Sequence, residues 1–270
     1  MKDYTLKYGK GSVTFALDEA HVTELYGTPV PKIDDIRAAL YATLSSPVSH
    51  EPLESWVNPE DKVALIVSDM SRFWMRQDLV VPHIISYLTD KCDVNQNNIT
   101  IIIANGTHPG GDENELRTLV TDGVYDRIRV VNHDCQAKDL VYIGTTSLGT
   151  EVRINPIAAN ADKVIMLGAC TYHVMAGYGG GRKSILPGIS GLETIRQNHL
   201  HSLDLLAPRS NPLIGNGVTD GNPLNEDMCQ AAAMVKNLFG INLVTNADMQ
   251  LAHIISGDPI KSWQLACHRV

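Results

Sequence analysis

Residues 62–72 read KVALIVSDMSR, a short apolar run that ends in the polar stretch Asp69–Arg72. An uninterrupted apolar run of this length, bounded by polar residues, is typical of a strand that is buried on both faces of a parallel sheet. We therefore predict a strand over Lys62–Ser68. Its carboxyl end carries Asp69 and Arg72.

Three further runs have the same character: Ile99–Ala104 (ITIIIA), Ile128–Val131 (IRVV) and Lys163–Gly168 (KVIMLG). Helix-compatible segments, Leu79–Cys92 and Asp112–Val120, lie between them. Strands that alternate with helices indicate an α/β fold in which helices cover both faces of the sheet. The sequence thus predicts a mostly parallel, doubly wound, Rossmann-like sheet.

Each predicted strand is followed by a polar segment that contains glycine or histidine. These segments are Asp69–Arg72, Asn105–His108, Asn132–Asp134 and Thr171–His173. Ligands of open α/β sheets bind outside the carboxyl ends of the strands. We expect the four segments to form one composite site.

The remaining patterns predict a hairpin at the start of the chain and several helices. The expected elements are a hairpin from Tyr4–Tyr8 to Ser12–Leu17, helices over Ile33–Leu44, Leu192–His201, Glu226–Leu238 and Pro259–His268, and a strand over Ile241–Thr245.

The composition favours a soluble protein that binds a small molecule. In 270 residues, 44% are hydrophobic and the net charge is −8, which excludes the basic surface of a nucleic-acid-binding protein. No apolar run approaches the roughly 18 residues of a membrane span. Five scattered cysteines without a C-x-x-C pair fit reduced thiols, and so indicate the cytoplasm.

Residues 173–191, HVMAGYGGGRKSILPGISG, form a glycine-rich segment around the pair Arg182-Lys183. Such a segment lets backbone amides approach an anion, and the two cations complement its charge. Arg182 occupies a glycine position of both the P-loop and the dinucleotide fingerprint, so neither motif is present. The alternative is an exposed, flexible loop.

This segment and the histidine that follows it at 199, together with SDMSR at 68–72 and NGTH at 105–108, resemble the LarA family of nickel-dependent lactate racemases. The resemblance implies that residues 1–270 are the family's N-terminal cofactor-binding catalytic domain, and that the family's second, C-terminal domain is absent from this chain. It also implies a racemase or epimerase of a 2-hydroxy acid that works by hydride transfer to and from its cofactor.

The family's cofactor is a nickel-pincer nucleotide, pyridinium-3,5-bisthiocarboxylic acid mononucleotide nickel, and the resemblance implies a covalent bond to Lys183. His199 corresponds to the nickel ligand, and His108 and His173 to the acid/base pair. Asp69 and Arg72 match a D-x-x-R element whose arginine meets the substrate carboxylate. The other implied cofactor-binding residues are Thr107, Gly179, Gly180, Gly181 and Arg182. Cofactor-synthesis proteins are the implied partners.

Structural roles for the same residues remain open. Any one of the ten histidines is more often structural than catalytic. Asp69 and Arg72 could be a helix cap and a surface ion pair. Lys183 could serve as a phosphate counter-ion. We favour a loop-bracing role for His133, and expect His201 to point away from His199 because the two lie two residues apart on a helix.

Two positions depart from the commoner family pattern. Phe73-Trp74 follows Arg72 where a proline is expected, and Pro109–Gly111 follows His108 in place of a basic residue. Both changes suggest a hydroxy acid other than lactate. A carrier domain that holds the cofactor without turnover is the alternative function. A nucleotide-hydrolysing enzyme is a third hypothesis.

Overall fold

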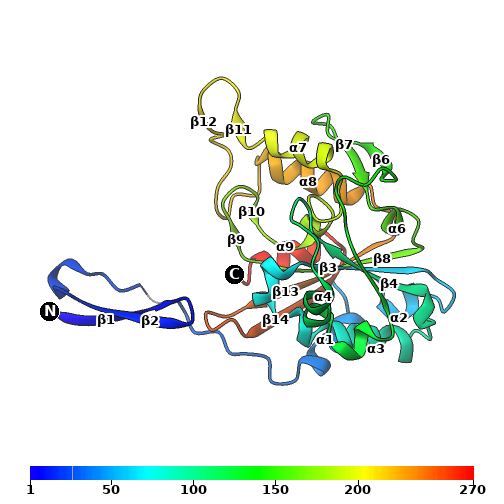
Figure 1. Ribbon diagram of the computed structural model, residues 1–270, viewed down its shortest axis with the longest axis horizontal. Coiled ribbons are helices and arrows are strands. Elements are labelled where there is room, and N and C mark those ends of the chain that lie inside the picture. The colour runs from blue at the N-terminus through cyan, green and yellow to red at the C-terminus, as the bar shows by residue number, and fades with distance from the viewer. Residues whose placement is uncertain (26) are drawn as a thin grey trace. The chain divides into compact units, whose positions relative to one another are not determined.

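The computed structural model describes residues 1–25 and 27–270, which divide into two compact units, Met1–Val30 and Pro31–Val270 (Figure 1). The larger unit is built on a six-stranded sheet in the order β14-β13-β8-β3-β4-β5. Its strands are β3 (Val63–Ser68), β4 (Ile99–Ala104), β5 (Arg129–Asn132), β8 (Lys163–Ala169), β13 (Leu238–Thr245) and β14 (Leu251–Gly257). Only β14 is antiparallel to its neighbour. The predicted mostly parallel α/β sheet is confirmed.

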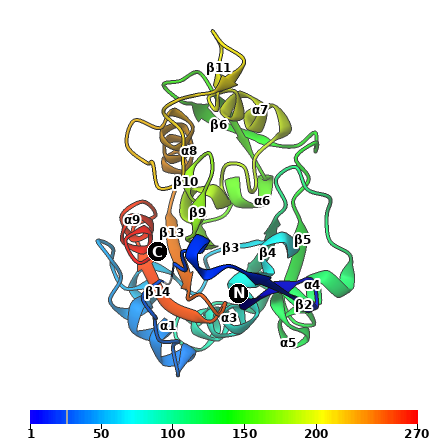
Figure 2. The ribbon, with the colours of Figure 1, turned by 90° about the vertical axis from the view of Figure 1, so that its left-hand side faces the viewer.

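The strand order reverses once along the chain. From β3 the chain adds β4 and then β5 on one side, and later adds β8, β13 and β14 on the other side (Figure 2). The connections that leave β3 and β8 therefore diverge at the carboxyl ends of these two strands. Such a switch point is where open α/β sheets bind their ligands.

Alternation along β3 explains its continuous apolar run. Val63, Leu65 and Val67 belong to one apolar cluster. Ala64 and Ile66 face the opposite cluster, because successive side chains of a strand point to opposite faces. The first cluster includes residues of helices α1 (Ile36–Ser45), α3 (Val81–Asp90) and α4 (Glu113–Val120), and the second includes residues of α8 (Pro223–Ala233). Neither face of the central strands is left to water.

Side-chain caps determine where several helices begin. The Asp35 carboxylate accepts a hydrogen bond from Ala38 N at 2.9 Å, and Asp112 forms a capping box with Glu115. Helix α8 begins at Pro223, because Asn222 caps it and proline suits the first turn. The predicted helix over 226–238 was therefore wrong at both ends. Its last residue is the first of β13, where Leu238 pairs with Val164 of β8.

Strand pairing also produces strands that the sequence pattern did not show, one in the large sheet and two in a separate hairpin. Strand β14 and the hairpin of β6 (Val141–Thr145) and β7 (Glu151–Ile154) were not predicted. The shorter elements are α2 (Leu53–Trp56), α5 (Asp122–Tyr125), α6 (Pro156–Ala159), α7 (Leu192–Leu200), α9 (Lys261–Cys267), β9 (Tyr172–His173), β10 (Gly177–Tyr178), β11 (Leu203–Asp204) and β12 (Arg209–Ser210). Among the described residues, no helix combines the length and apolar character that crossing a membrane requires.

The unit Met1–Val30 contains the predicted hairpin. Strands β1 (Lys2–Tyr8) and β2 (Gly11–Leu17) pair antiparallel, with Tyr4 opposite Phe15. The two rings stack with centroids 6.4 Å apart, as cross-strand aromatic pairs do.

Strand β8 lies directly beneath the glycine-rich segment. A Cβ atom added at Gly168 would lie 3.0 Å from Cα of Gly180 and 3.2 Å from N of Gly181. Both contacts are with backbone, which cannot rotate away as a side chain does. The absence of a side chain at Gly168 is therefore what lets the segment rest on the strand.

We predict that Gly168→Ala lowers the free energy of unfolding by about 1–3 kcal/mol, because the added methyl group overpacks a backbone contact. Chemical denaturation measures the change. Gly123→Ala is the matched control, since nothing lies within 4 Å of a Cβ atom at that position in α5. Equal stabilities of the two variants would contradict the close packing of segment and strand.

Candidate active site

A cavity of about 430 Å³ lies at the carboxyl ends of β3, β4 and β8. Nine of the eleven predicted site residues line it. They are Asp69, Arg72, Thr107, His108, His173, Gly179, Gly180, Lys183 and His199. Gly181 and Arg182 are not among its lining residues. The switch point of the sheet is therefore also the place where the sequence motifs meet.

Asp69 and His108 form a hydrogen-bonded pair across two neighbouring strand ends. His108 Nδ1 donates to Asp69 Oδ2 at 2.6 Å, and Ser71 Oγ donates to Asp69 Oδ1, also at 2.6 Å. Because Nδ1 carries the proton, the lone pair of the neutral ring lies on Nε2. The pair therefore holds Nε2 of His108 as a hydrogen-bond acceptor.

The cap and ion-pair reading of Asp69 and Arg72 does not describe this site. Asp69 is the residue before the 3₁₀ turn Met70–Met75, but its side chain makes no capping bond. Arg72 is exposed, and its Nη1 donates to Ser71 Oγ at 3.2 Å. The guanidinium at the cavity wall is thus available to a carboxylate ligand.

His173 follows β8 and has the opposite arrangement of ring nitrogens. Its Nδ1 accepts hydrogen bonds from the backbone N–H groups of Met175 (3.2 Å) and Ala176 (3.1 Å). The proton of the neutral ring therefore lies on Nε2, which makes that atom a donor. Burial, together with the positive charges of Lys183 and Arg72, lowers the pKa of His173 to about 4.

Lys183 lies in the 3₁₀ turn Gly181–Ser184 and is partly buried at the cavity wall. Burial lowers its pKa to about 7, with Arg182 and Arg72 acting in the same direction. A substantial fraction of the amine is neutral, and hence nucleophilic, at physiological pH. Gly179 and Gly181 beside it are buried, so the alternative of an exposed, flexible loop is wrong.

Arg182 does not line the cavity, and its side chain binds the buried side of the glycine-rich segment. It is fully buried, and its Nε donates to Asn225 Oδ1 at 2.8 Å. The guanidinium lies 3.7 Å from the ring centroid of Trp263. It also donates to four carbonyl oxygens of the segment, those of Ala176, Tyr178, Gly179 and Gly180. The expectation that Arg182 contacts the cofactor is not supported by this placement.

His199 of α7 presents one ring nitrogen to the cavity. Its Nδ1 donates to Ile195 O at 2.9 Å, so the lone pair of the neutral ring lies on Nε2. Burial lowers the pKa of His199, and the charge of Lys183 adds to that effect. Among residues 1–25 and 27–270, no group of three or more His, Cys, Asp or Glu side chains could hold a metal ion.

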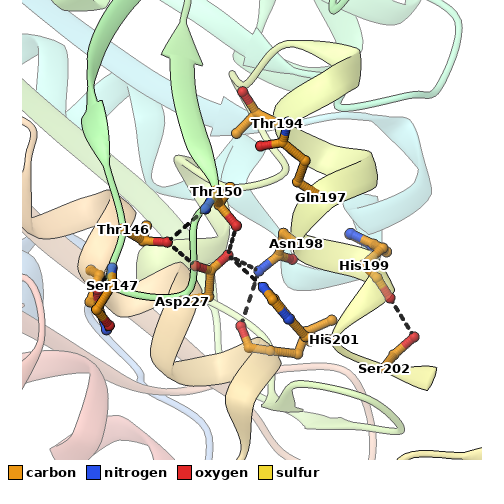
Figure 3. A network of polar contacts seen from close by, with 12 residues as sticks. Thr146, Ser147, Thr150, Thr194, Gln197, Asn198, His199, His201, Ser202 and Asp227 are labelled. Carbon is orange, nitrogen blue, oxygen red and sulfur yellow. Dashed lines mark hydrogen bonds and ion pairs between the residues drawn. The ribbon is translucent and has the colours of Figure 1, made fainter. Parts of the chain in front are cut away.

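A buried carboxylate anchors the helix that carries His199. Figure 3 shows Asp227 of α8 pointing toward Thr146, Thr150 and Asn198. Their donors lie 2.5, 2.8 and 2.8 Å from its oxygens. His201 faces this network, with Nε2 3.9 Å from Asp227 Oδ2, whereas His199 lines the cavity, so the two histidines point apart as predicted. Sequence analysis missed Asp227, because an aspartate beside Glu226 on a helix gives no signal of burial.

One of the four strand-end segments does not join the site. His133 is buried, its Nε2 donates to Ser190 O at 2.9 Å, and its Nδ1 accepts from Asn155 Nδ2 at 3.3 Å. The favoured loop-bracing role is confirmed. The composite site of four segments was wrong in this part. The site also includes Met75 and Ile195, which sequence analysis did not assign to it.

An open α/β sheet with a cavity at its switch point, lined by imidazoles and a lysine, is an architecture typical of α/β proteins that bind small molecules. The family is more specific. A model of the lactate racemase N-terminal domain matches residues 8–209, and the chain belongs to that family.

Two curated lactate racemases are similar to the chain. The protein from Thermoanaerobacterium thermosaccharolyticum is 26% identical over 279 residues that cover 100% of this chain. The protein from Lactiplantibacillus plantarum is 27% identical over 267 residues, or 97% of the chain. The chain spans 62% and 61% of their respective lengths.

Two solved structures share the fold. The lactate racemase apoprotein from T. thermosaccharolyticum matches with a TM-score of 0.87 at 24% identity, covering 99% of this chain and 62% of that one. A protein from Thermotoga maritima matches with a TM-score of 0.65 at 18% identity, covering 87% of this chain and 57% of that one.

The low pKa of His173 predicts a pH dependence of stability. The pKa lies below the value of 6.5 expected in the unfolded chain, so the unfolded state binds more protons between these two values. The contribution of neutral His173 to the free energy of unfolding is therefore fully present above pH 6.5 and is lost as the pH drops toward 4. In this range the parent protein should lose up to about 1.4 kcal/mol per pH unit through His173, and His173→Gln should not show this loss.

Urea denaturation at a series of pH values measures the effect. His268→Gln, which changes an exposed histidine, is the control and should leave the loss unchanged. If His173→Gln lost stability in the same way as the parent, His173 would not be held in its neutral form.

Proposed function

We propose that this chain is the N-terminal cofactor-binding catalytic domain of a racemase or epimerase of 2-hydroxy acids. The main support is that residues with complementary chemistry line a single cavity. Lys183 offers an amine, His199 a ring nitrogen and Arg72 a guanidinium. The imidazoles of His108 and His173 line the same cavity and have opposite hydrogen-bonding roles. The two curated lactate racemases support racemisation of lactate or a related hydroxy acid as the reaction.

The residues present fit a nickel-pincer nucleotide attached to Lys183. The pKa of about 7 provides a neutral amine for covalent attachment, and Gly179, Gly180 and Thr107 line the wall beside it. Nε2 of His199 is a suitable nickel donor. When bound, this cofactor would supply an electron-poor carbon that takes up the α-hydride of the substrate and returns it.

The protein's own residues bind the substrate and move its hydroxyl proton. Arg72 holds the carboxylate, which places the reacting carbon in the cavity. Nε2 of His108 accepts the hydroxyl proton, and Asp69 stabilises the resulting imidazolium. His173 presents Nε2–H to the substrate oxygen from its own strand end. For His173 to act as the base, its proton has to move to Nδ1, at the expense of two backbone hydrogen bonds.

A carrier domain without turnover is the second candidate. The observation that favours it is that the His108 side chain is 51% exposed, whereas hydride transfer needs a site from which water is excluded. Measurable inversion of a 2-hydroxy acid by the cofactor-loaded chain would rule out the carrier.

We also propose a cytoplasmic location, with cofactor-synthesis proteins as partners. The five cysteines are free in the structure, and four of them are buried, as expected of thiols that stay reduced.

Lys183→Ala should abolish covalent loading of the cofactor, because it removes the amine that forms the bond. Intact mass spectrometry of protein co-expressed with cofactor-making enzymes tests this, with nickel analysis of the same samples. The parent should gain the cofactor mass. Lys236→Ala, which changes an exposed lysine on the surface, should gain it as well. An adduct of unchanged mass on Lys183→Ala would refute the anchor.

The two imidazoles should differ in the enantiomer that they serve. Rapid mixing of loaded protein with each enantiomer should show that His108→Ala slows cofactor reduction by one of them by roughly 10²–10⁴-fold, through loss of the positioned base. His173→Ala should show the reverse preference. Both variants should lose full racemisation in both directions, since a catalyst cannot change the equilibrium between enantiomers. The same preference in both variants would assign at least one histidine a structural role.

A further inference from the structure

A second cavity, of about 310 Å³, lies against the first. The two share four lining residues: Asp69, Ser71, Asn105 and His108. The Asp69–His108 pair therefore stands between them, with open space on both sides. The second cavity is bounded on its far side by residues of helix α4, including Glu115 and Leu119.

The surface that the second cavity presents to a ligand is largely apolar. Met70, Ile103, Pro109 and Leu119 contribute hydrocarbon surface. The polar side chains there already have partners within the protein. Asp69 accepts from His108 and Ser71, and Glu115 Oε2 accepts from Asp112 N at 3.3 Å.

Asn105 is also engaged on both ends of its amide. Its Nδ2 donates to Pro109 O at 3.3 Å, and its Oδ1 accepts from His133 N at 3.2 Å. None of the lining residues of this cavity in the described chain is a lysine or arginine, whereas two, Asp69 and Glu115, are acidic. A second carboxylate on a ligand would therefore meet like charge and no cationic partner.

We propose that the second cavity is the subsite for the side chain of the substrate, so that the preferred substrate is a 2-hydroxy acid with a branched aliphatic or aromatic side chain. This inference rests on the proposed function. With the carboxylate at Arg72 and the hydroxyl at His108, the remaining carbon substituent extends past His108 into the apolar space. The methyl group of lactate would leave that space unfilled, and a hydroxy dicarboxylic acid would place its second charge there.

Isothermal titration calorimetry of the cofactor-free chain tests the preference directly. The ligands are lactate, 2-hydroxy-4-methylpentanoate, 3-phenyllactate and malate. Each methylene group buried in the subsite should tighten binding roughly four-fold, so the two larger monocarboxylates should bind most tightly. Malate should bind no better than lactate. Lactate or malate binding as tightly as the larger acids would overturn the proposal.

Filling the cavity should remove the preference. Met70→Trp adds an aromatic ring at a partly buried position that lines only the second cavity, and should reduce binding of 3-phenyllactate to the level of lactate. Leu148→Trp, on an exposed turn outside both cavities, is the control and should keep the preference. If Met70→Trp still prefers 3-phenyllactate to lactate, the substrate side chain binds outside the second cavity.

Reversing one charge should change the ligand class. Glu115→Arg introduces a cation into the subsite and should tighten malate binding about ten-fold, as a hydrogen bond to a charged group does. Glu113→Arg makes the same change of charge on α4 outside the cavity and should have little effect. If both variants gained the same affinity for malate, the cause would be the change of net charge, and the proposed subsite would be contradicted.

Racemisation assays of the loaded protein separate this inference from the proposed function. If no acid is racemised but the larger acids bind most tightly, the proposed function fails and the subsite stands. If lactate is racemised with a higher kcat/KM than the larger acids, the function stands and the subsite is refuted.

Discussion

The shape of the site depends on one desolvated guanidinium. Arg182 is fully buried, and none of the ion pairs in the described chain involves it. Burying a charge is costly unless its donors are satisfied, and here four carbonyl groups, those of Ala176, Tyr178, Gly179 and Gly180, satisfy them together with Asn225 Oδ1. The segment 176–180 must therefore curl around the guanidinium. That curl rests the segment on Gly168 and turns Lys183 toward the cavity.

Burial and nearby charge together set the protonation of the site. Burial is the main cause that lowers the pKa values of His173 and Lys183 to about 4 and 7, and the charges of Arg182 and Arg72 act in the same direction. A bound anion would oppose this effect, because it stabilises the protonated forms. Binding of an anionic ligand is therefore coupled to proton uptake. The Lys183 amine is therefore more nucleophilic before an anion binds beside it than afterwards.

The local sequence pattern was sufficient to predict the central strands, because a run such as Ile99–Ala104 is apolar whatever elements lie beside it. It also located His108 and Lys183, because strand ends and glycine-rich segments are local features. The role of Arg182 could not be predicted in this way. Its burial depends on Trp263, which is 81 positions further along the chain, and on Asn225. Asp227 is similar, because its donors Thr146 and Thr150 come from the turn between β6 and β7, and Asn198 comes from α7.

In the proposed reaction, the Asp69–His108 pair would connect substrate fit with proton transfer. It stands between two cavities, and the His108 side chain is half-exposed. Water around the imidazole weakens its interaction with Asp69 and would compete for the proton that Nε2 accepts in the proposed reaction. An apolar group beside the ring removes that water and strengthens both interactions. A substituent that fills the second cavity would thus improve the base as well as the binding, so selectivity should appear in kcat as well as in KM.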